Sequence, residues 1–294
     1  MYFSRVRVKP DIRELSHLHN ILRGDGYSVH QLLWDFFPGD QERKFLFREE
    51  IAGEQIPHYR GARGEPIFYL VSQNEPQNGH PLFIVESKPY KPRIIVGDHL
   101  SFKLRANPTV TRKENGRKNS VRHDVVMDAQ YHYLRELAYA AGVNNVGRKS
   151  GLKKLILESW LESKDAGIRI KLEQMMERNE RYQELLDQTL SPTKLFDSAL
   201  KAASDLKLEK WLNDKGKKNG FVIATDERRK RLKFQAEGYR WHAMPRKGRS
   251  AGFSSSDFEG EIKVTDPMQF VDALYKGIGS AKAFGCGLML VKRI

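Results

Sequence analysis

Side chains alternate between two faces with a period of two at the start of the chain. This period predicts β-strands, because successive side chains of a strand point to opposite faces. The first predicted strand covers 1–8, where even-numbered positions share one face. Short apolar runs flanked by polar residues predict three more strands, at 45–48, 67–71 and 82–85.

A helical period separates the first two of these strands. Val29, Leu32, Leu33, Phe36 and Phe37 recur at helical spacing, Ser28 is the expected N-cap, and Pro38-Gly39 is the expected stop. The order is therefore strand, helix, strand, strand, strand. It is typical of a ferredoxin-like half whose second helix is reduced.

A similar alternation returns in the second half of the chain. Asp266 is the expected N-cap of a helix that starts with Pro267 and is capped by Gly277. We therefore predict an α+β protein with tandem ferredoxin-like (RRM-like) domains at 1–92 and 96–294, although no sequence repeat relates them. Strands are expected at 100–104, 221–224, 232–236, 258–264 and 288–291.

A long helical region, about 125–207, interrupts the second predicted domain. It is rich in Leu, Lys, Glu and Ala, and helix breaks are expected at 142–151, near Gly167 and at Ser191-Pro192. One interpretation is a solvated helical bundle. The other is a docking surface for a neighbouring subunit, and the sequence leaves both open.

The segment 277–290 reads G-I-G-S-A-K-A-F-G-C-G-L-M-L and lies between a helix end and a strand. Glycine permits backbone angles that are closed to other residues, and Lys282 adds a positive charge. Dinucleotide-binding loops run from strand to helix, which is the opposite order. A tight packing turn and a platform for a polyanion backbone are the two remaining interpretations.

Charge points to the kind of partner. The formal net charge is +14 and the pI is about 9.7, which favours a polyanion such as nucleic acid. A membrane partner is not expected, since no apolar run reaches the length of a membrane span. A single cysteine, Cys286, excludes an internal disulfide and a cysteine-based zinc site. The N-terminal strand does not resemble a signal peptide, and a reducing, cytoplasmic location is expected.

His30 is the candidate catalytic residue, in the first turn of the predicted helix. The helix macrodipole disfavours an imidazolium there and would lower the pKa of His30. A neutral imidazole could take the proton of a ribose 2′-hydroxyl or, once protonated, give one to a leaving 5′-oxygen. Tyr27, three residues earlier, could orient the attacking group. A helix with an incidental histidine is the alternative, and no metal site or cofactor is predicted.

The segment 225–249 is strongly basic. It contains nine Lys or Arg and three acidic residues, and Tyr239 and Trp241 occur among them. A basic hairpin against an A-form RNA stem is one interpretation, and a solvated turn is the other. Arg105 either faces RNA or pairs with an acid at a strand end. The predicted RNA-binding cations of the 225–249 stretch are Arg228, Arg229, Lys230, Arg231, Lys233 and Arg240.

Four motifs occur in a specific order: Y-S-V-H-Q-L-L-W at 27–34, L-R-A-N-P at 104–108, F-E-G at 258–260 and the glycine-rich loop. With the M-Y-F-S start, they resemble the CasE family of CRISPR repeat-processing endoribonucleases, type I-E. The resemblance covers about 1–124 and 208–294. It leaves most of 125–207 as a lineage-specific insertion.

The resemblance implies metal-independent cleavage of CRISPR precursor RNA at the base of the repeat stem-loop, as part of antiviral defence. The products would carry a 5′-hydroxyl and a cyclic or open 3′ phosphate. The protein would stay bound to the hairpin (crRNA) in the Cascade complex, next to other subunits and chiefly the backbone subunit. His30 falls on the family's catalytic histidine and Tyr27 on its assisting tyrosine. The alternative is a non-catalytic RNA-hairpin-binding module. The glycine-rich loop adds five RNA-binding positions: Gly277, Gly279, Lys282, Gly285 and Gly287.

Overall fold

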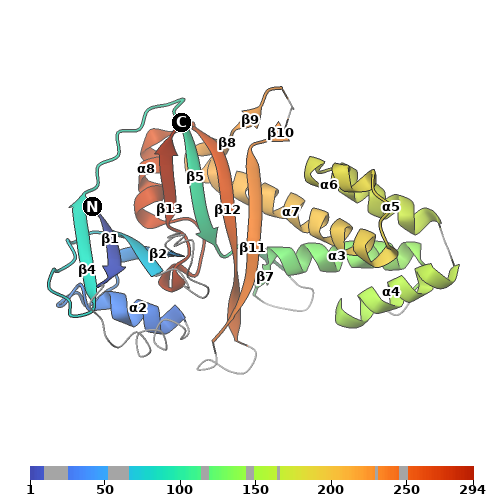
Figure 1. The fold of residues 1–294 in the computed structure, drawn as a ribbon, viewed down its shortest axis with the longest axis horizontal. Helices are drawn as coiled ribbons and strands as arrows, with labels where there is room; N and C mark the ends of the chain where they lie inside the picture. Colours follow the sequence, from blue (N-terminus) through green and yellow to red (C-terminus); the bar gives the residue numbers. More distant parts are fainter. Residues whose placement is uncertain are drawn as a thin grey trace, which may run out of the picture. The chain divides into compact units, whose positions relative to one another are not determined.

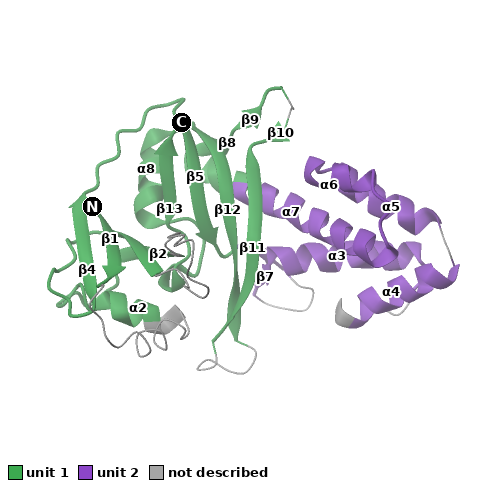
Figure 2. Cartoon of the chain, in the orientation of Figure 1, with its two compact units in different colours: residues 1–107, 213–294 green, residues 108–212 purple. Residues whose placement is uncertain are grey.

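The chain forms two compact units, which are coloured separately in Figure 2. Unit 1 combines Met1–Asn107 with Asn213–Ile294, and unit 2 is Pro108–Leu212. No helix in the described part of the chain is long and apolar enough to cross a bilayer. The computed structural model describes residues 1–9, 26–51, 66–113, 119–143, 149–163, 166–228, 231–244 and 251–294.

The N-terminal sheet of unit 1 has the strand order β2-β3-β1-β4, with all neighbours antiparallel. This is the ferredoxin-like order, and one helix, α2 (Gly26–Trp34), connects the first two strands (Figure 1). The four strand predictions are confirmed, with bounds that differ by a few residues. The strands are β1 (Tyr2–Val8), β2 (Phe45–Ile51), β3 (Pro66–Ser72) and β4 (Phe83–Pro89).

The predicted bounds of the first helix are wrong at both ends. α2 begins at Gly26, so Ser28 lies inside the helix and does not cap it. The helix ends at Trp34, and Phe36 and Phe37 lie in the following turn. Both rings are nevertheless buried, in the same core as Val29 and Leu33. The apolar spacing predicted correctly that Phe36 and Phe37 are buried, because side chains of a turn can pack into the same core as those of the preceding helix.

The C-terminal sheet of unit 1 repeats the same topology. Its order is β11-β12-β5-β13, and β8 also pairs with β12. The helix α8 (Pro267–Lys276) precedes the last strand, as α7 precedes β8 in the chain. The chain is therefore an α+β protein with tandem ferredoxin-like domains, as predicted; the domain boundary near 92–96 stays a prediction. The strands are β5 (His99–Ala106), β8 (Phe221–Ile223), β11 (Phe234–Ala243), β12 (Gly252–Val264) and β13 (Met289–Arg293).

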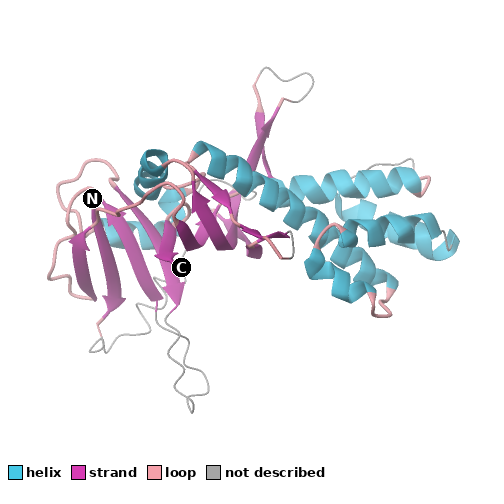
Figure 3. Ribbon diagram, turned by 90° about the horizontal axis from the view of Figure 1, so that it is seen from above, coloured by secondary structure: helices cyan, strands magenta, loops and turns pink. Residues whose placement is uncertain are grey.

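The two sheets of unit 1 stand in a row when seen from above (Figure 3). Leu46 and Val71 of the N-terminal sheet share a small core with Leu288, which directly precedes β13. The Tyr275 hydroxyl of α8 also donates a hydrogen bond to the Tyr90 carbonyl, at 2.9 Å. The apolar contacts of Leu288 with Leu46 and Val71 hold the end of the glycine-rich loop against the N-terminal sheet.

Unit 2 is the helical insertion. A two-stranded sheet, β6 (Thr109–Arg112) and β7 (Val121–Asp124), leads into it, and the Asp124 carboxylate caps the first helix. The insertion has its own apolar core, which includes Leu134, Leu172 and Phe196. The expected break near Gly167 is confirmed, because one helix ends at Ser163 and the next begins at Ala166, with Gly167 in its first turn. The helices are α3 (Val125–Ala140), α4 (Lys149–Ser163), α5 (Ala166–Glu177), α6 (Glu180–Leu186) and α7 (Pro192–Lys218).

The basic stretch 225–249 is not one hairpin. Its first part forms a short ladder of β9 (Thr225–Asp226) with β10 (Arg231–Leu232). Its second part is β11, which pairs with the strand that follows it, β12. β12 begins at Gly252, six residues before the predicted start. β11 lies at the sheet edge and is mostly exposed, so it lacks the apolar alternation that marks a half-buried strand.

Candidate nucleic-acid interface and catalytic histidine

The glycine-rich loop begins at the C-terminal end of α8. The Asp266 carboxylate accepts a hydrogen bond from the Gln269 amide at 3.0 Å, and Gly277 caps the other end at φ 74°. Both cap predictions are confirmed. Ala281 adopts the left-handed conformation at φ 56°, which is strained for a residue with a side chain. The loop glycines with positive φ are Gly277, Gly279, Gly285 and Gly287.

Packing explains two of these glycines. A Cβ on Gly277 would lie 2.9 Å from Leu46 Cδ1, and one on Gly285 would lie 3.1 Å from Phe47 Cε2. A short 3₁₀ helix, η2 (Lys282–Phe284), lies between them and contacts both β2 and α2. The loop therefore packs against the N-terminal sheet and against the helix that carries His30.

Backbone hydrogen bonds close the base of the loop. The Ile278 amide donates to the Gly287 carbonyl at 2.9 Å, and the Gly287 amide donates to the Arg105 carbonyl at 2.7 Å. Asn107 forms an isolated β-bridge with Ser280. The Asn107 Oδ1 and Ser280 Oγ atoms are buried and have no hydrogen-bond partner among the described residues. Buried polar atoms in this state can be satisfied by a ligand or water, which is consistent with a binding surface.

His30 lies in an aromatic setting on α2. Its ring stacks on Phe45 of β2, with centroids 5.7 Å apart, and meets Trp34 edge-on at 5.3 Å. Burial lowers the pKa of His30, and the positive charge of Arg43 lowers it further. The direction matches the sequence prediction, but the causes are burial and Arg43 in place of the helix macrodipole. The side chain of Tyr27, the other predicted catalytic residue, lies outside the described part of the structure.

Three cations act on Lys282, which belongs to η2. We call Arg43, Lys215, Lys276 and Lys282 the Arg43 cluster. Burial lowers the pKa of Lys282, and the other three cations lower it further. The Lys282 ammonium donates a hydrogen bond to the Lys276 carbonyl at 2.6 Å. Lys276 pairs with Asp272 at 2.9 Å. Within the described chain, neither Arg43 nor Lys282 pairs with a carboxylate, so the cluster keeps an excess of positive charge.

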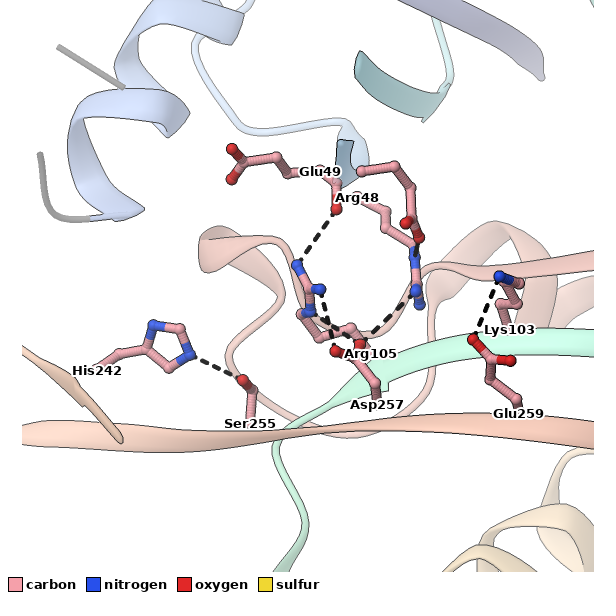
Figure 4. A network of polar contacts seen from close by, with 9 residues as sticks. Arg48, Glu49, Lys103, Arg105, His242, Ser255, Asp257 and Glu259 are labelled. Atoms are coloured by element: carbon pink, nitrogen blue, oxygen red, sulfur yellow. Dashed lines mark hydrogen bonds and ion pairs between the residues drawn. The ribbon is translucent and has the colours of Figure 1, made fainter. Parts of the chain in front are cut away.

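Arg105 lies in a second group of charges, which Figure 4 shows from close by. Its guanidinium donates two hydrogen bonds to Asp257, from Nε at 2.9 Å and Nη2 at 3.1 Å. Nη1 donates to the Glu49 carbonyl at 3.2 Å. Arg48 approaches Asp257 to 3.6 Å and also pairs with Glu50. We call Arg48, Glu50, Arg105 and Asp257 the Arg105 cluster. Pairing with an acid, the second interpretation offered for Arg105, is present; a contact with RNA stays a prediction.

The other predicted RNA-binding cations are spread over separate elements. Lys233 pairs with Glu261 at 2.5 Å. Arg231 lies on β10, opposite Asp226 in the ladder, and Arg228 lies in the β9–β10 turn. Arg240 lies on β11 between Tyr239 and Trp241, whose side chains are exposed. Arg229 and Lys230 lie outside the described residues.

Two residues near the loop were missed by sequence reasoning. Arg43 stands in a polar turn just before β2, and nothing in the local sequence marks it as a site residue. His242 of β11 approaches the Ser255 hydroxyl to 2.8 Å, and its ring stacks on Phe253 with centroids 4.6 Å apart. Phe253 in turn meets Phe284 of η2 at 5.1 Å. Only through-space proximity connects these residues with the glycine-rich loop.

No group of three or more residues able to hold a metal ion occurs in the described ranges. His132, for example, is an exposed ring beside Asp128 in unit 2.

Comparisons with known proteins agree on the fold. A family model described as "CRISPR associated protein" matches residues 1–194 and 176–293. No curated protein matches the chain by sequence. The structure is similar to that of Cse3 of Thermus thermophilus bound to an RNA representing a pre-cleavage complex, with 18% identity and a TM-score of 0.56, over 99% of this chain and 98% of that one.

Two other solved structures are similar over their full lengths. One is the CRISPR endoribonuclease Cse3 bound to a 19-nucleotide RNA, at 18% identity and a TM-score of 0.56, with 99% of this chain and 100% of that chain covered. The other is the CRISPR-associated protein Cas6e of Escherichia coli K-12, at 20% identity and a TM-score of 0.53, with 100% of both chains covered.

Proposed function

The chain belongs to the family of CRISPR-associated proteins, and on that basis we propose that it is an endoribonuclease of CRISPR precursor RNA. It cleaves at the base of the repeat stem-loop and stays bound to the product as a subunit of the type I-E Cascade complex. Two similar structures are of RNA-bound proteins, and one of these is described as an endoribonuclease. Their similarity to this chain supports the shared architecture on which the proposal builds.

One observation carries the proposal: α2, which bears His30, contacts η2 of the glycine-rich loop beside the Arg43 cluster. An imidazole whose pKa is lowered by burial and by Arg43 therefore lies on a helix that contacts the loop carrying Lys282. RNA cleavage requires both a proton-transfer group and cations that hold the phosphodiester.

The reaction needs no metal, because the substrate supplies the nucleophile. The ribose 2′-oxygen attacks the neighbouring phosphorus as its proton is removed, and the bond from phosphorus to the 5′-oxygen breaks. The leaving oxygen takes up a proton, so the products are a 5′-hydroxyl and a 2′,3′-cyclic phosphate, which water can open. We assign His30 to one of the two proton transfers, with Tyr27 assisting.

The C-terminal domain holds the RNA in this proposal. The glycine-rich loop, Arg105, the β9–β10 ladder and β11 contribute cations, and Tyr239 and Trp241 are exposed on the same edge strand. Double-stranded RNA is recognised mainly through its shape, phosphates and 2′-hydroxyls, so recognition is expected to follow the hairpin shape. A lasting grip on the hairpin fits a protein that remains in the complex after cleavage.

The boundaries of the two domains, 1–92 and 96–294, belong to this proposal as well. The insertion, about 125–207 with α7 extending beyond it, is a helical unit with its own core. A role of this unit as a docking surface is tested by measuring assembly of the complex. Charge-reversal variants on its exposed faces would then impair assembly and leave cleavage of isolated repeat RNA unchanged.

The test is cleavage of repeat RNA by the purified protein in excess EDTA. Substitution of His30 by Ala is expected to slow cleavage by about 10²–10⁴-fold, the usual contribution of a positioned acid or base. The matched control is His132→Ala, which removes an exposed imidazole from unit 2.

A 2′-deoxy nucleotide at the cleavage site is expected to abolish the reaction, and end-group analysis should find the 5′-hydroxyl. Cleavage of the deoxy substrate would contradict the mechanism. Tight binding of the unmodified RNA without any cleavage would favour the non-catalytic hairpin-binding module.

A further inference from the structure

Arg43 lies outside every motif that the sequence marked. It follows α2 in the chain and precedes β2 by two residues. α2 carries no lysine or arginine of its own, so the cation beside His30 comes from this turn. α2, which carries His30, and β2, which begins two residues after Arg43, both contact η2, which contains Lys282. Arg43 therefore belongs to the same neighbourhood as these two side chains, and its positive charge lowers the pKa of both.

The environment of the guanidinium is unusual for a structural arginine. Its Nη1 atom is buried and has no hydrogen-bond partner in the described part of the chain. No described carboxylate pairs with it, and burial lowers the pKa of Arg43 with no opposing acid. An arginine whose role is structural normally gains an acid or carbonyl partner in return for its desolvation, as Arg48 and Arg105 do.

We propose that Arg43 is a catalytic residue that binds a non-bridging oxygen of the scissile phosphate, next to Lys282. The proposal rests on the endoribonuclease function proposed above. An arginine donates several N–H groups in a fixed plane, which suits two phosphate oxygens at once. As the 2′-oxygen attacks, negative charge builds up on the non-bridging oxygens, and a guanidinium held in place by the fold stabilises that charge.

The neighbouring atoms fit this assignment. Lys282 is held by its hydrogen bond to the Lys276 carbonyl, so its charge has a fixed position. The strained backbone at Ala281 directly precedes it. The unsatisfied Ser280 and Asn107 oxygens lie at the same loop. A phosphodiester bound there would neutralise the excess of positive charge. The hydroxyl groups of the adjoining riboses would form hydrogen bonds with the Ser280 and Asn107 oxygens.

The test compares Arg43→Gln with the wild-type protein on a repeat RNA that the wild type cleaves. The cleavage rate at saturating protein is expected to fall about 100-fold, the usual effect of removing one donor to a developing oxyanion. The Kd for the same RNA with a 2′-deoxy cleavage site is expected to change by less than about tenfold, since one phosphate contact among several is lost. Lys44→Gln is the matched control, because Lys44 is the next residue and is exposed.

Two further readouts separate catalysis from folding. Free guanidinium ion added at millimolar concentration is expected to restore part of the rate of Arg43→Gln and none of the rate of His30→Ala. Arg43→Lys, which keeps the charge but loses the planar donor set, is expected to fall between wild type and Arg43→Gln. If Arg43→Gln does not fold, as judged by its Tm, the Arg43→Lys rate decides.

An unchanged saturated rate in Arg43→Gln, or in Arg43→Lys if only that variant folds, would overturn the assignment and leave the endoribonuclease proposal intact. A loss that appears only in Kd would overturn it too, because Arg43 would then bind RNA away from the reacting phosphate. If the wild-type protein cleaves no repeat RNA, the proposed function fails first and Arg43 loses its role with it.

Discussion

Two groups of cations flank the glycine-rich loop, and their chemical states differ. In the Arg105 cluster, acidic residues neutralise the cations. Asp257 accepts hydrogen bonds from Arg105 and approaches Arg48, and Glu50 pairs with Arg48. In the Arg43 cluster, Arg43 and Lys282 pair with no carboxylate in the described chain, and Lys282 has its pKa lowered by burial and its neighbours. Acids of the fold therefore neutralise the first group, whereas Arg43 and Lys282 of the second group keep an uncompensated charge among the described residues.

The difference shows that the number of cations in a segment is a poor guide to how many of them lack an acidic partner in the fold. The densest basic stretch, 225–249, includes Lys233, which is paired with Glu261. The uncompensated charge lies around Arg43, in a turn of mixed charge. A cation neutralised within the fold must break an existing pair to bind phosphate, which reduces its net gain.

The largest effect is expected from Asp257→Ala, which would leave Arg48 and Arg105 without their shared acid. The Arg48 side chain is only 3% exposed, so its charge would be buried with one remaining partner, Glu50. A loss of about 3 kcal/mol in the free energy of unfolding is expected, measured by urea denaturation.

Glu259→Ala is the matched control for Asp257→Ala. It lies on the same strand and face, and it removes the acid from the exposed Lys103–Glu259 pair, in which both side chains are more than half exposed. Its cost is expected to be below about 1 kcal/mol. Equal costs for the two variants would remove the structural distinction between the clusters.

The next effect concerns the loop that positions Lys282. Gly285→Ala would place a Cβ against Phe47 at φ 78°, and a cost of about 2 kcal/mol is expected from conformational strain and crowding. Gly39→Ala is the control: it has φ 96° with nothing within 4 Å of the added Cβ, so it measures the strain alone. Ala281→Gly should act in the opposite direction by relieving the strain at φ 56°. Thermal unfolding of the three variants would check the order.

A smaller effect should appear in the salt dependence of RNA binding. Lys282→Gln is expected to reduce the slope of log Kd against log salt by about 1, because one phosphate contact is lost. Lys103→Gln removes a lysine that is already paired with Glu259 and should leave the slope almost unchanged. A larger change for Lys103 than for Lys282 would reverse the comparison.

The smallest effect is a pH dependence of stability from His30. Its folded pKa is lowered from 6.5 by burial and by Arg43, so the unfolded chain binds a proton there more readily than the folded one. Its contribution is therefore present above the unfolded value and is lost as pH falls toward the folded value. Between about pH 7.5 and 5, the wild type should lose more stability than His30→Gln. Urea midpoints would measure the difference, and parallel curves would contradict the lowered pKa.

Local signals in the sequence predicted much of the fold. Alternation predicted β1, a short apolar run predicted β3, and the pair Asp266-Pro267 with Gly277 marked both ends of α8. The prediction failed where the local signal was ambiguous. Ser28 has the side chain of a cap but lies inside α2, and β11 is too exposed for its alternation to be visible.

The site was only partly predictable for a related reason. His30 and the glycine-rich loop could be picked out because each belongs to a motif with characteristic spacing. Arg43 could not, since its importance depends on a distance to Lys282 that no spacing along the chain encodes. The same holds for Asp257, which lies 152 positions from the arginine that it binds.

By itself, the sequence determined the alternation of strands and helices, the helix caps and the overall excess of positive charge. These follow from backbone preferences and side-chain periodicity, which act over a few residues. The tertiary structure alone decided which cations are neutralised and which remain for a phosphate. Coulomb attraction and desolvation depend on distance and burial, and these exist only once the two sheets have packed around the loop.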